Sequence, residues 1–245
     1  VYTCGYLGYG RTIRFANLIW FPLRKNPRRK GPPMMRRMMP TVLLTLIACL
    51  LVADASAAEK EKDGWSSLFD GKSLEGWKVN ENPDSFSVTD GAIVAKGPRA
   101  HLFYSGKLKN HNFKNFHFKA DVKTLPGSNA GLYFHTKFQK TGWPSIGYEV
   151  QVNQTHKDPK KSSGLYAVRD VFKAPAKDNE WYTQEIIVKG KHIITKVNGK
   201  TLVDYVEPDG VEGGRKISSG TFAIQAHDPK SVVFFKNIQV KPLAD

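Results

Sequence analysis

The feature that most constrains this 245-residue chain is a succession of short alternating segments separated by glycine, proline and asparagine turns. Residues 115–123 show it most cleanly, because Phe116, Phe118, Ala120 and Val122 alternate with polar residues. A period of two places successive side chains on opposite faces of a β-strand. No segment has a sustained helical period. The pattern predicts an all-β fold, a sandwich or jelly roll of antiparallel sheets.

Turn residues predict where these strands reverse. Thr89-Asp90-Gly91 and Asn198-Gly199 each lie between β-prone segments and predict tight hairpins. Residues 164–171 (GLYAVRDV) follow a further turn and are expected to form another strand.

The first part of the chain has the features of an export signal. Residues 34–39 form a basic head, residues 41–53 an apolar run of 13, and Ala55-Ser56-Ala57 a small-residue cleavage site. The run is shorter than a membrane span requires. Residues 34–58 are therefore predicted to be a signal peptide, residues 1–33 a spurious extension, and residues 59–245 the mature domain, periplasmic or secreted.

Cys4 and Cys49 are the only cysteines, so the predicted mature domain has neither a disulfide nor a thiol nucleophile. Cys49 follows Leu46-Ile47-Ala48, which resembles a lipoprotein cleavage motif. The apolar run continues beyond Cys49, so a lipid anchor there is the minority alternative to cleavage near Ala57.

The net charge of +15 does not indicate a nucleic-acid-binding protein. Residues 1–58 carry nine Lys/Arg and one acid, which leaves 28 basic and 21 acidic residues in the predicted mature domain. The remaining excess is spread over lysine-bearing strands without an arginine-rich block. Nucleic acid is therefore not expected as a partner, and no membrane span is expected.

The clearest candidate site lies in residues 147–154 (GYEVQVNQ), where apolar and polar side chains alternate. Motifs for phosphate loops, zinc peptidases and serine hydrolases are absent from the sequence. Polar side chains near strand centres remain, and on one face of a curved sheet they would converge. The candidates are Glu149, Gln151, His135, Tyr166, Arg169, Gln225 and His227, with Trp143 as a sugar-stacking platform.

Each candidate also has a structural explanation. Glu149 is equally well explained as a cross-strand partner of a lysine, and lone histidines such as His135 and His227 are more often half-buried structural residues. His135, Glu149 and His227 could alternatively surround a divalent cation, although their spacing is non-local. No cofactor is certain from the sequence, and a divalent metal ion is left open.

Six segments in order resemble the family once called DUF1080, the 3-keto-glycoside lyase/hydratase (3-keto-disaccharide hydrolase) domain. The resemblance covers about Gly64 to Leu243. The segments are residues 65–77, 128–134, 147–152, 198–199, 224–227 and 235–243. One departure is His135, where many relatives end a GVFLR-like strand with arginine. The resemblance implies a concanavalin A-like jelly roll that cleaves oxidised glycosides.

The chemistry of such substrates assigns roles to the candidates. A ketone at C3 acidifies the C2 hydrogen, so a base can start β-elimination of the C1 substituent, after which water adds to the double bond. We hypothesise Glu149 or His227 as the base and His135, with Arg169 or a metal ion, facing the enolate. Gln151, Tyr166 and Gln225 would orient hydroxyl groups.

Two other functions remain open at this point. The same sandwich architecture serves non-catalytic carbohydrate-binding modules, and lysine-rich strands would suffice for a surface adhesion domain. A glycoside or oligosaccharide is the expected partner of the enzyme and of the binding module. The oligomeric state is left open. Clustering of His135, Glu149 and His227 in one cavity would favour the enzyme.

Overall fold

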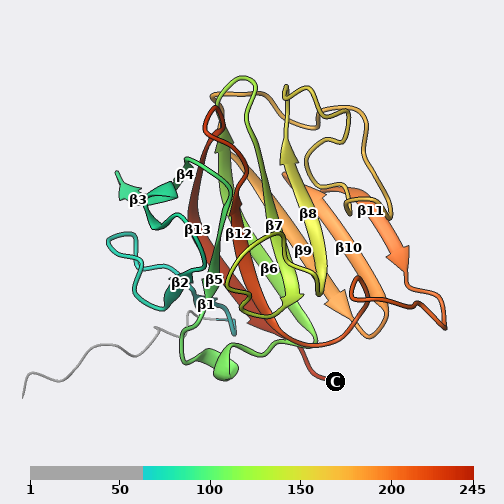
Figure 1. Ribbon diagram of the computed structural model, residues 1–245. Helices are drawn as coiled ribbons and strands as arrows, with labels where there is room; N and C mark the ends of the chain where they lie inside the picture. Colours follow the sequence, from blue (N-terminus) through green and yellow to red (C-terminus); the bar gives the residue numbers. More distant parts are fainter. Residues whose placement is uncertain (1–62) are drawn as a thin grey trace, which may run out of the picture. The chain divides into compact units, whose positions relative to one another are not determined.

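The computed structural model describes residues 63–245, which form two antiparallel β-sheets that enclose a common core (Figure 1). The jelly-roll sandwich predicted from the sequence is confirmed. The predictions for residues 1–33, residues 34–58 and Cys49 lie outside the described residues. In the part that is described, no helix has the length and apolar character needed to cross a membrane.

The larger sheet has eight strands, and its hydrogen-bonded order runs from β11 to β3 with β1 paired to β13. In that order the strands are β11 (Lys200–Val206), β10 (His192–Val197), β9 (Tyr182–Lys189), β6 (Phe116–Thr124), β13 (Val232–Pro242), β4 (Ala92–Lys96) and β3 (Phe86–Thr89), with β1 (Ser66–Ser67) at the side.

The smaller sheet has five strands, and it carries the candidate site. Their order is β2 (Trp77–Val79), β5 (Ala100–Tyr104), β12 (Thr221–Ala226), β7 (Asn129–Thr136) and β8 (Tyr148–Asn153). Two short 3-10 turns complete the described elements, η1 (Pro83–Ser85) and η2 (Leu108–His111).

The turn chemistry of the hairpins agrees with the sequence, whereas one expected strand does not form. Asn198 (φ 48°) and Gly199 (φ 76°) join β10 to β11, and Asp90 and Gly91 join β3 to β4 with similar positive φ values. Two successive positive φ angles define the type I′ turn that matches strand twist. Residues 164–171 instead form a compact loop, whose only ladder contacts are isolated bridges at Leu165.

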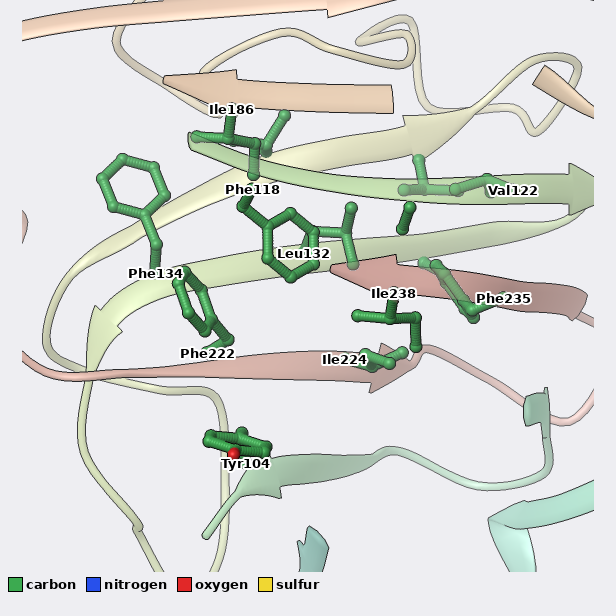
Figure 2. Packing of buried hydrophobic residues seen from close by; sticks show 14 of the residues in the cluster. Tyr104, Phe118, Val122, Leu132, Phe134, Ile186, Phe222, Ile224, Phe235 and Ile238 are labelled. Carbon is green, nitrogen blue, oxygen red and sulfur yellow. The ribbon is translucent and has the colours of Figure 1, made fainter. Parts of the chain in front are cut away.

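The core lies between the sheets and is rich in aromatic side chains (Figure 2). The inward residues of β6 alternate with half-exposed ones, as the sequence predicts. Phe222 packs its ring within 4.9 Å of the rings of Phe113, Phe116 and Phe118, measured between centroids. The aromatic cluster therefore ties β12 of the smaller sheet to β6 of the larger one.

We expect Phe222→Ala to lower the free energy of unfolding by about 3–5 kcal/mol, because truncation leaves a cavity at a side chain that is only 2% exposed. Urea denaturation followed by fluorescence measures the change. Phe172→Ala is the matched control, since Phe172 is 68% exposed and should change stability by less than about 0.5 kcal/mol. Equal losses in the two variants would contradict this account of the core.

The two sheets differ in how their outer faces are covered. Strands β5, β7, β8 and β12 are buried at every position, so their outward side chains are covered as well as their core-facing ones. Many of these outward side chains are polar, including His101, Glu149, Gln151 and Gln225. Buried polar groups that are shielded from solvent require hydrogen-bond partners or a ligand, so this face is the candidate binding surface.

Candidate functional site

Strand register aligns four outward positions in a row across the smaller sheet. His101 of β5 lies opposite Gln225 of β12, and Gly131 of β7 lies opposite Gln151 of β8. Ile224 pairs with Leu132, so Gln225 is also the neighbour of Gly131. Side chains in register on one face lie close enough to interact. The row His101–Gln225–Gly131–Gln151 is called the polar row below.

A second row runs beside the polar row, two residues away from it on each strand. Ala223 pairs with Phe103 and with Tyr133, and Tyr133 pairs with Glu149. Phe103, Ala223 and Tyr133 form a small buried cluster that is separate from the main core. The face therefore has an apolar strip with a carboxyl group at its end.

Glu149 occupies a desolvated position where it accepts hydrogen bonds. Its side chain is 8% exposed, and Oε1 accepts a 2.9 Å hydrogen bond from Nε2 of Gln225. Nε2 of Gln225 also donates to the Tyr133 hydroxyl at 2.9 Å. Burial raises the pKa of Glu149, although hydrogen bonds from Tyr133 and Gln225 and the charges of Arg215 and His227 act to lower it. Glu149 therefore keeps its proton to a higher pH than an exposed glutamate.

Gly131 leaves the space that the Glu149 carboxyl group fills. A Cβ atom added at Gly131 would lie 2.5 Å from Oε1 of Glu149, which is closer than non-bonded atoms approach. Gly131 has no positive φ angle, so close approach alone accounts for glycine here. The glycine in the middle of the polar row thus lets a neighbouring carboxyl group reach across it.

We expect Gly131→Ala to lower activity on the substrate proposed below by about tenfold or more, because the added methyl displaces the carboxyl group from Gln225. Kinetics of the purified variant, together with its melting temperature, measure the two effects separately. Gly106→Ala is a useful comparison, since its added Cβ would meet the Tyr104 ring rather than Glu149. Full activity in Gly131→Ala would show that this approach does not matter.

Several buried polar atoms in the polar row have no hydrogen-bond partner among the described residues. They are both ring nitrogens of His101, Oε1 of Gln151 and Oε1 of Gln225. Burial lowers the pKa of His101 to about 3, so its ring is neutral at pH 7 and offers one donor and one acceptor. Leaving such groups unpaired costs about 1–3 kcal/mol each. A ligand with several hydroxyl groups would satisfy them.

His227 lies just past the end of β12 and is oriented by its neighbour Asp228. Nδ1 of His227 is 2.9 Å from Oδ2 of Asp228. Burial acts to raise the pKa of Asp228, but hydrogen bonds from His227, Ser231 and the backbone of Lys230 outweigh it and bring the pKa down to about 2. In the neutral ring, an ionised carboxylate at Nδ1 keeps the proton on that nitrogen and directs the lone pair to Nε2.

Trp143 covers this end of the face from the loop between β7 and β8. Its ring lies 5.5 Å from that of His101 and 5.4 Å from that of His227, measured between centroids. The loop is held by Glu81, whose Oε1 accepts a 3.0 Å hydrogen bond from the Gly142 backbone and one from Arg99. The indole is 45% exposed, so a flat apolar surface beside the polar row is open to a ligand.

The 3-keto-alpha-glucoside-1,2-lyase-like domain family matches residues 64–241 of the chain. The chain belongs to this family.

Other known proteins resemble this family member in sequence or in fold. A 3-keto-disaccharide hydrolase of Bacteroides thetaiotaomicron is 25% identical, and the match covers 59% of each chain, so it spans about three fifths of that relative. A protein of Parabacteroides distasonis ATCC 8503 that is provisionally named a glycosyl hydrolase has 25% identity and a TM-score of 0.62, over 74% of this chain and 94% of its own. The carbohydrate-binding module CBM66 of Bacillus subtilis, at 15% identity and a TM-score of 0.51, covers 68% and 95% respectively and shows the fold alone.

Most of the residues predicted for this family member lie on one face. Glu149, Gln151 and Gln225 are brought together by strand register, and Trp143 and His227 lie together at its edge. Tyr166 lies in the 154–181 loop, where its backbone oxygen accepts a hydrogen bond from Arg215. Arg215 in turn acts on the pKa of Glu149, so the Tyr166 loop is linked to the carboxyl group.

His135 is a correction, because the structure does not place it with Glu149. The β7–β12 register shifts between Thr221 and Ala223, and His135 has a positive φ of 54°, which marks a bulge. Its Nε2 is 2.9 Å from the Lys114 carbonyl oxygen, and its Nδ1 accepts a 3.2 Å hydrogen bond from the Ser218 backbone. Burial lowers its pKa to about 4. Both ring nitrogens serve the backbone, so the ring cannot face an enolate.

Arg169 is a second correction. It is exposed, its guanidinium lies 5.2 Å from the Tyr205 ring centroid, and it donates to the neighbouring Val168 carbonyl oxygen. The cation that acts on Glu149 is Arg215, in the loop before β12. Alternation cannot identify a loop residue, and residues 164–171 were expected to be a strand, so this cation was missed.

The predicted metal-ligand set of His135, Glu149 and His227 is not assembled. Among residues 63–245, the groups that could hold an ion are His156, His227 and Asp228, whose ligand atoms lie within 4.8 Å of one another. The hydrogen bonds of these three residues do not favour ion binding. Asp228 already accepts three hydrogen bonds. Nδ1 of His156 accepts hydrogen bonds from the Asp158 backbone and from Nδ2 of Asn129, which leaves the proton on Nε2.

Proposed function

We propose that this protein is a carbohydrate-active enzyme that cleaves 3-keto-glycosides by β-elimination followed by hydration, a net hydrolysis. The observation that carries the proposal is a buried carboxyl group with a raised pKa on the same sheet face as a carboxylate-oriented histidine. Such a pair supplies a group that holds a proton and a group that accepts one. Membership of the family supports the same substrate class.

The elimination step uses one base and one acid. In the proposal, Nε2 of His227 takes the hydrogen from C2 of the sugar, and the electron pair is delocalised onto the C3 oxygen. The C1–O bond then breaks, and Glu149 gives its proton to the departing oxygen. The products are a 3-keto sugar with a C1–C2 double bond and the free alcohol. General acid–base assistance of this kind contributes about 10²–10⁴-fold at each position.

His101 takes the enolate-facing role that the sequence suggested for His135. Its ring is neutral and fully buried, and its N–H has no other partner in the described part of the chain. A neutral imidazole donates to a developing oxyanion without itself losing a proton. Gln151 and Gln225 would bind hydroxyl groups of the sugar through their unpaired side-chain oxygens. Trp143 would stack on the sugar ring.

The hydration step returns His227 and Glu149 to their starting protonation states. Water adds its hydroxyl group to C1 and a proton returns to C2 from His227, which gives the 3-keto sugar. Glu149, deprotonated after the elimination, accepts the proton of that water. Atoms and charges balance without an oxidant or reductant.

Incubation with 3-keto-trehalose or a 3-keto-aryl-glucoside, with and without chelator, tests the proposal by following the double-bond intermediate. We expect chelator to change neither the rate at which the intermediate forms nor the rate at which the free alcohol is released, since the His227–Asp228 hydrogen bond orients the base. Loss of activity with chelator, restored by a divalent cation, would instead place an ion at His156, His227 and Asp228.

A non-catalytic carbohydrate-binding module is the second candidate. The unpaired amide oxygens and the exposed Trp143 favour it, because they suffice for binding a sugar without turning it over. The two functions separate cleanly by experiment. Binding of 3-keto-trehalose in calorimetry without any release of the second sugar would identify the binding module.

We also propose that the protein is exported, with residues 34–58 as its signal peptide. Their basic head, apolar run and small-residue site support it. N-terminal sequencing of the protein recovered from the periplasm or medium should find a start near Glu59. A start at a lipidated Cys49 would support the lipid anchor instead.

A further inference from the structure

A cavity of about 490 Å³ lies on the same sheet as the proposed site. Its volume lies within the range of small-molecule sites. Strand β2, the ends of β5 and β7, the start of β12, the turn η2 and the segment just before β12 line it. The lining residues that matter here are Lys78, Phe103, Thr136, Lys137 and Phe138.

The cavity shares a wall residue with the apolar strip beside the proposed site. Phe103 lines it, and Phe103 also belongs to the buried strip with Ala223 and Tyr133, whose hydroxyl group bonds to Gln225 beside Glu149. The loop that carries Trp143 begins with Lys137 and Phe138, which both line the cavity. The apolar strip therefore runs from Glu149 to the wall of this cavity.

One wall of the cavity is aromatic. The rings of Phe103 and Phe138 meet edge to face, with centroids 5.4 Å apart. Phe138 is 40% exposed although it is a large apolar side chain. Exposed aromatic surface beside a cavity gives a planar ligand an edge or a face to pack on.

The charge of the lining is entirely positive. Lys78 places its Nζ 4.2 Å from the Phe138 ring centroid, and Lys137 also lines the cavity, while no aspartate or glutamate does. Within residues 63–245, neither lysine takes part in an ion pair. Two unneutralised ammonium groups attract an anion to the cavity.

Thr136 adds an independent sign of a ligand. Its side chain is 1% exposed and lines the cavity, yet its hydroxyl group has no hydrogen-bond partner in the described structure. Buried hydroxyl groups are almost always paired in native proteins. A polar atom of a bound molecule would give the Thr136 hydroxyl group its missing partner.

We propose that this cavity is the subsite for the leaving group and that it selects an aromatic alcohol bearing a negative charge, such as a carboxylated phenol. The proposal rests on the function proposed above, since it names the part of the substrate that departs from C1. The phenol ring would pack on Phe103 and Phe138, and its anionic group would meet Lys78 and Lys137.

Binding of the free alcohol tests the subsite without any turnover. We expect 4-hydroxybenzoate to bind about fivefold more tightly than phenol in NMR titrations at low salt, and the difference to shrink as salt is added. The double variant Lys78→Gln/Lys137→Gln should remove the difference. Lys200→Gln, on the far hairpin, is the matched control and should retain it.

Kinetics with 3-keto-glucosides of the same two alcohols supply the second measurement. Phe138→Ala should raise KM for both substrates, while Phe172→Ala, whose side chain is exposed and does not line the cavity, should not. Comparing each variant with the parent protein cancels the different reactivities of the two leaving groups. The lysine variant should lose selectivity for the carboxylated substrate.

The outcomes separate the two proposals. Turnover with no preference for the charged alcohol, or with a preference that survives the lysine variant, would overturn the subsite and leave the enzyme standing. Selective binding of 4-hydroxybenzoate without turnover of either glycoside would support the subsite as a ligand site and overturn the lyase. Tighter binding of phenol would contradict the charge argument directly.

Discussion

Glu149→Gln should lower kcat/KM for a 3-keto-aryl-glucoside by about 10²–10⁴-fold, because the amide cannot give a proton to the departing oxygen. The amide has nearly the same shape as the acid, so folding should be retained. Steady-state kinetics measure the loss, and the melting temperature confirms the fold. An effect confined to KM would mean that Glu149 only binds the sugar.

The pH profile supplies a second readout for Glu149. Burial raises its pKa, so the protonated form that acts as the acid persists to higher pH and is lost as the pH rises through that value. Activity of the parent protein should therefore fall on the alkaline side, and this limb should be absent from Glu149→Gln. Glu185→Gln is the matched control, since Glu185 lies on the larger sheet 2.8 Å from His117. A variant that keeps the alkaline limb would assign it to another group.

His227→Gln should lower kcat by a similar factor of about 10²–10⁴, because in the proposal the Nε2 lone pair of His227, whose ring is oriented by Asp228, removes the C2 proton. Asp228→Asn should lower kcat by about tenfold to a hundredfold while leaving KM nearly unchanged, since it weakens the hydrogen bond that orients the imidazole. Stopped-flow detection of the double-bond intermediate measures both.

A matched histidine–aspartate pair on the larger sheet controls for general effects of these substitutions. His192 of β10 lies 2.6 Å from Asp204 of β11, on a hairpin away from the smaller sheet. His192→Gln and Asp204→Asn should leave kcat unchanged. Full elimination activity in His227→Gln would remove His227 from the mechanism.

Much of the fold could be read from the sequence because its signals are local. The alternation in residues 115–123 and the Asn198-Gly199 turn each depend on a few neighbouring residues, and both formed as expected. The same alternation placed Glu149 and Gln151 on one face, and the structure agrees. Pattern reasoning succeeds where the local backbone is a regular strand.

The rest of the site depended on features that a one-dimensional pattern does not contain. A bulge in β7 turned His135 away, because one extra residue reverses every later assignment of faces. His101 was overlooked because its partner Gln225 is more than a hundred residues away and is reached only through strand register. Arg215 and His156 lie in loops, where no period predicts orientation.

The measurement that tests the central claim most directly is hydrogen exchange at C2 of a 3-keto sugar that lacks a leaving group, followed by NMR in D₂O. Such a ligand isolates proton removal from the later bond cleavage. We expect the parent protein and Glu149→Gln to catalyse the exchange, since the acid is not needed, and His227→Gln to lose it. Exchange that requires Glu149 but not His227, or no catalysed exchange at all, would contradict the account.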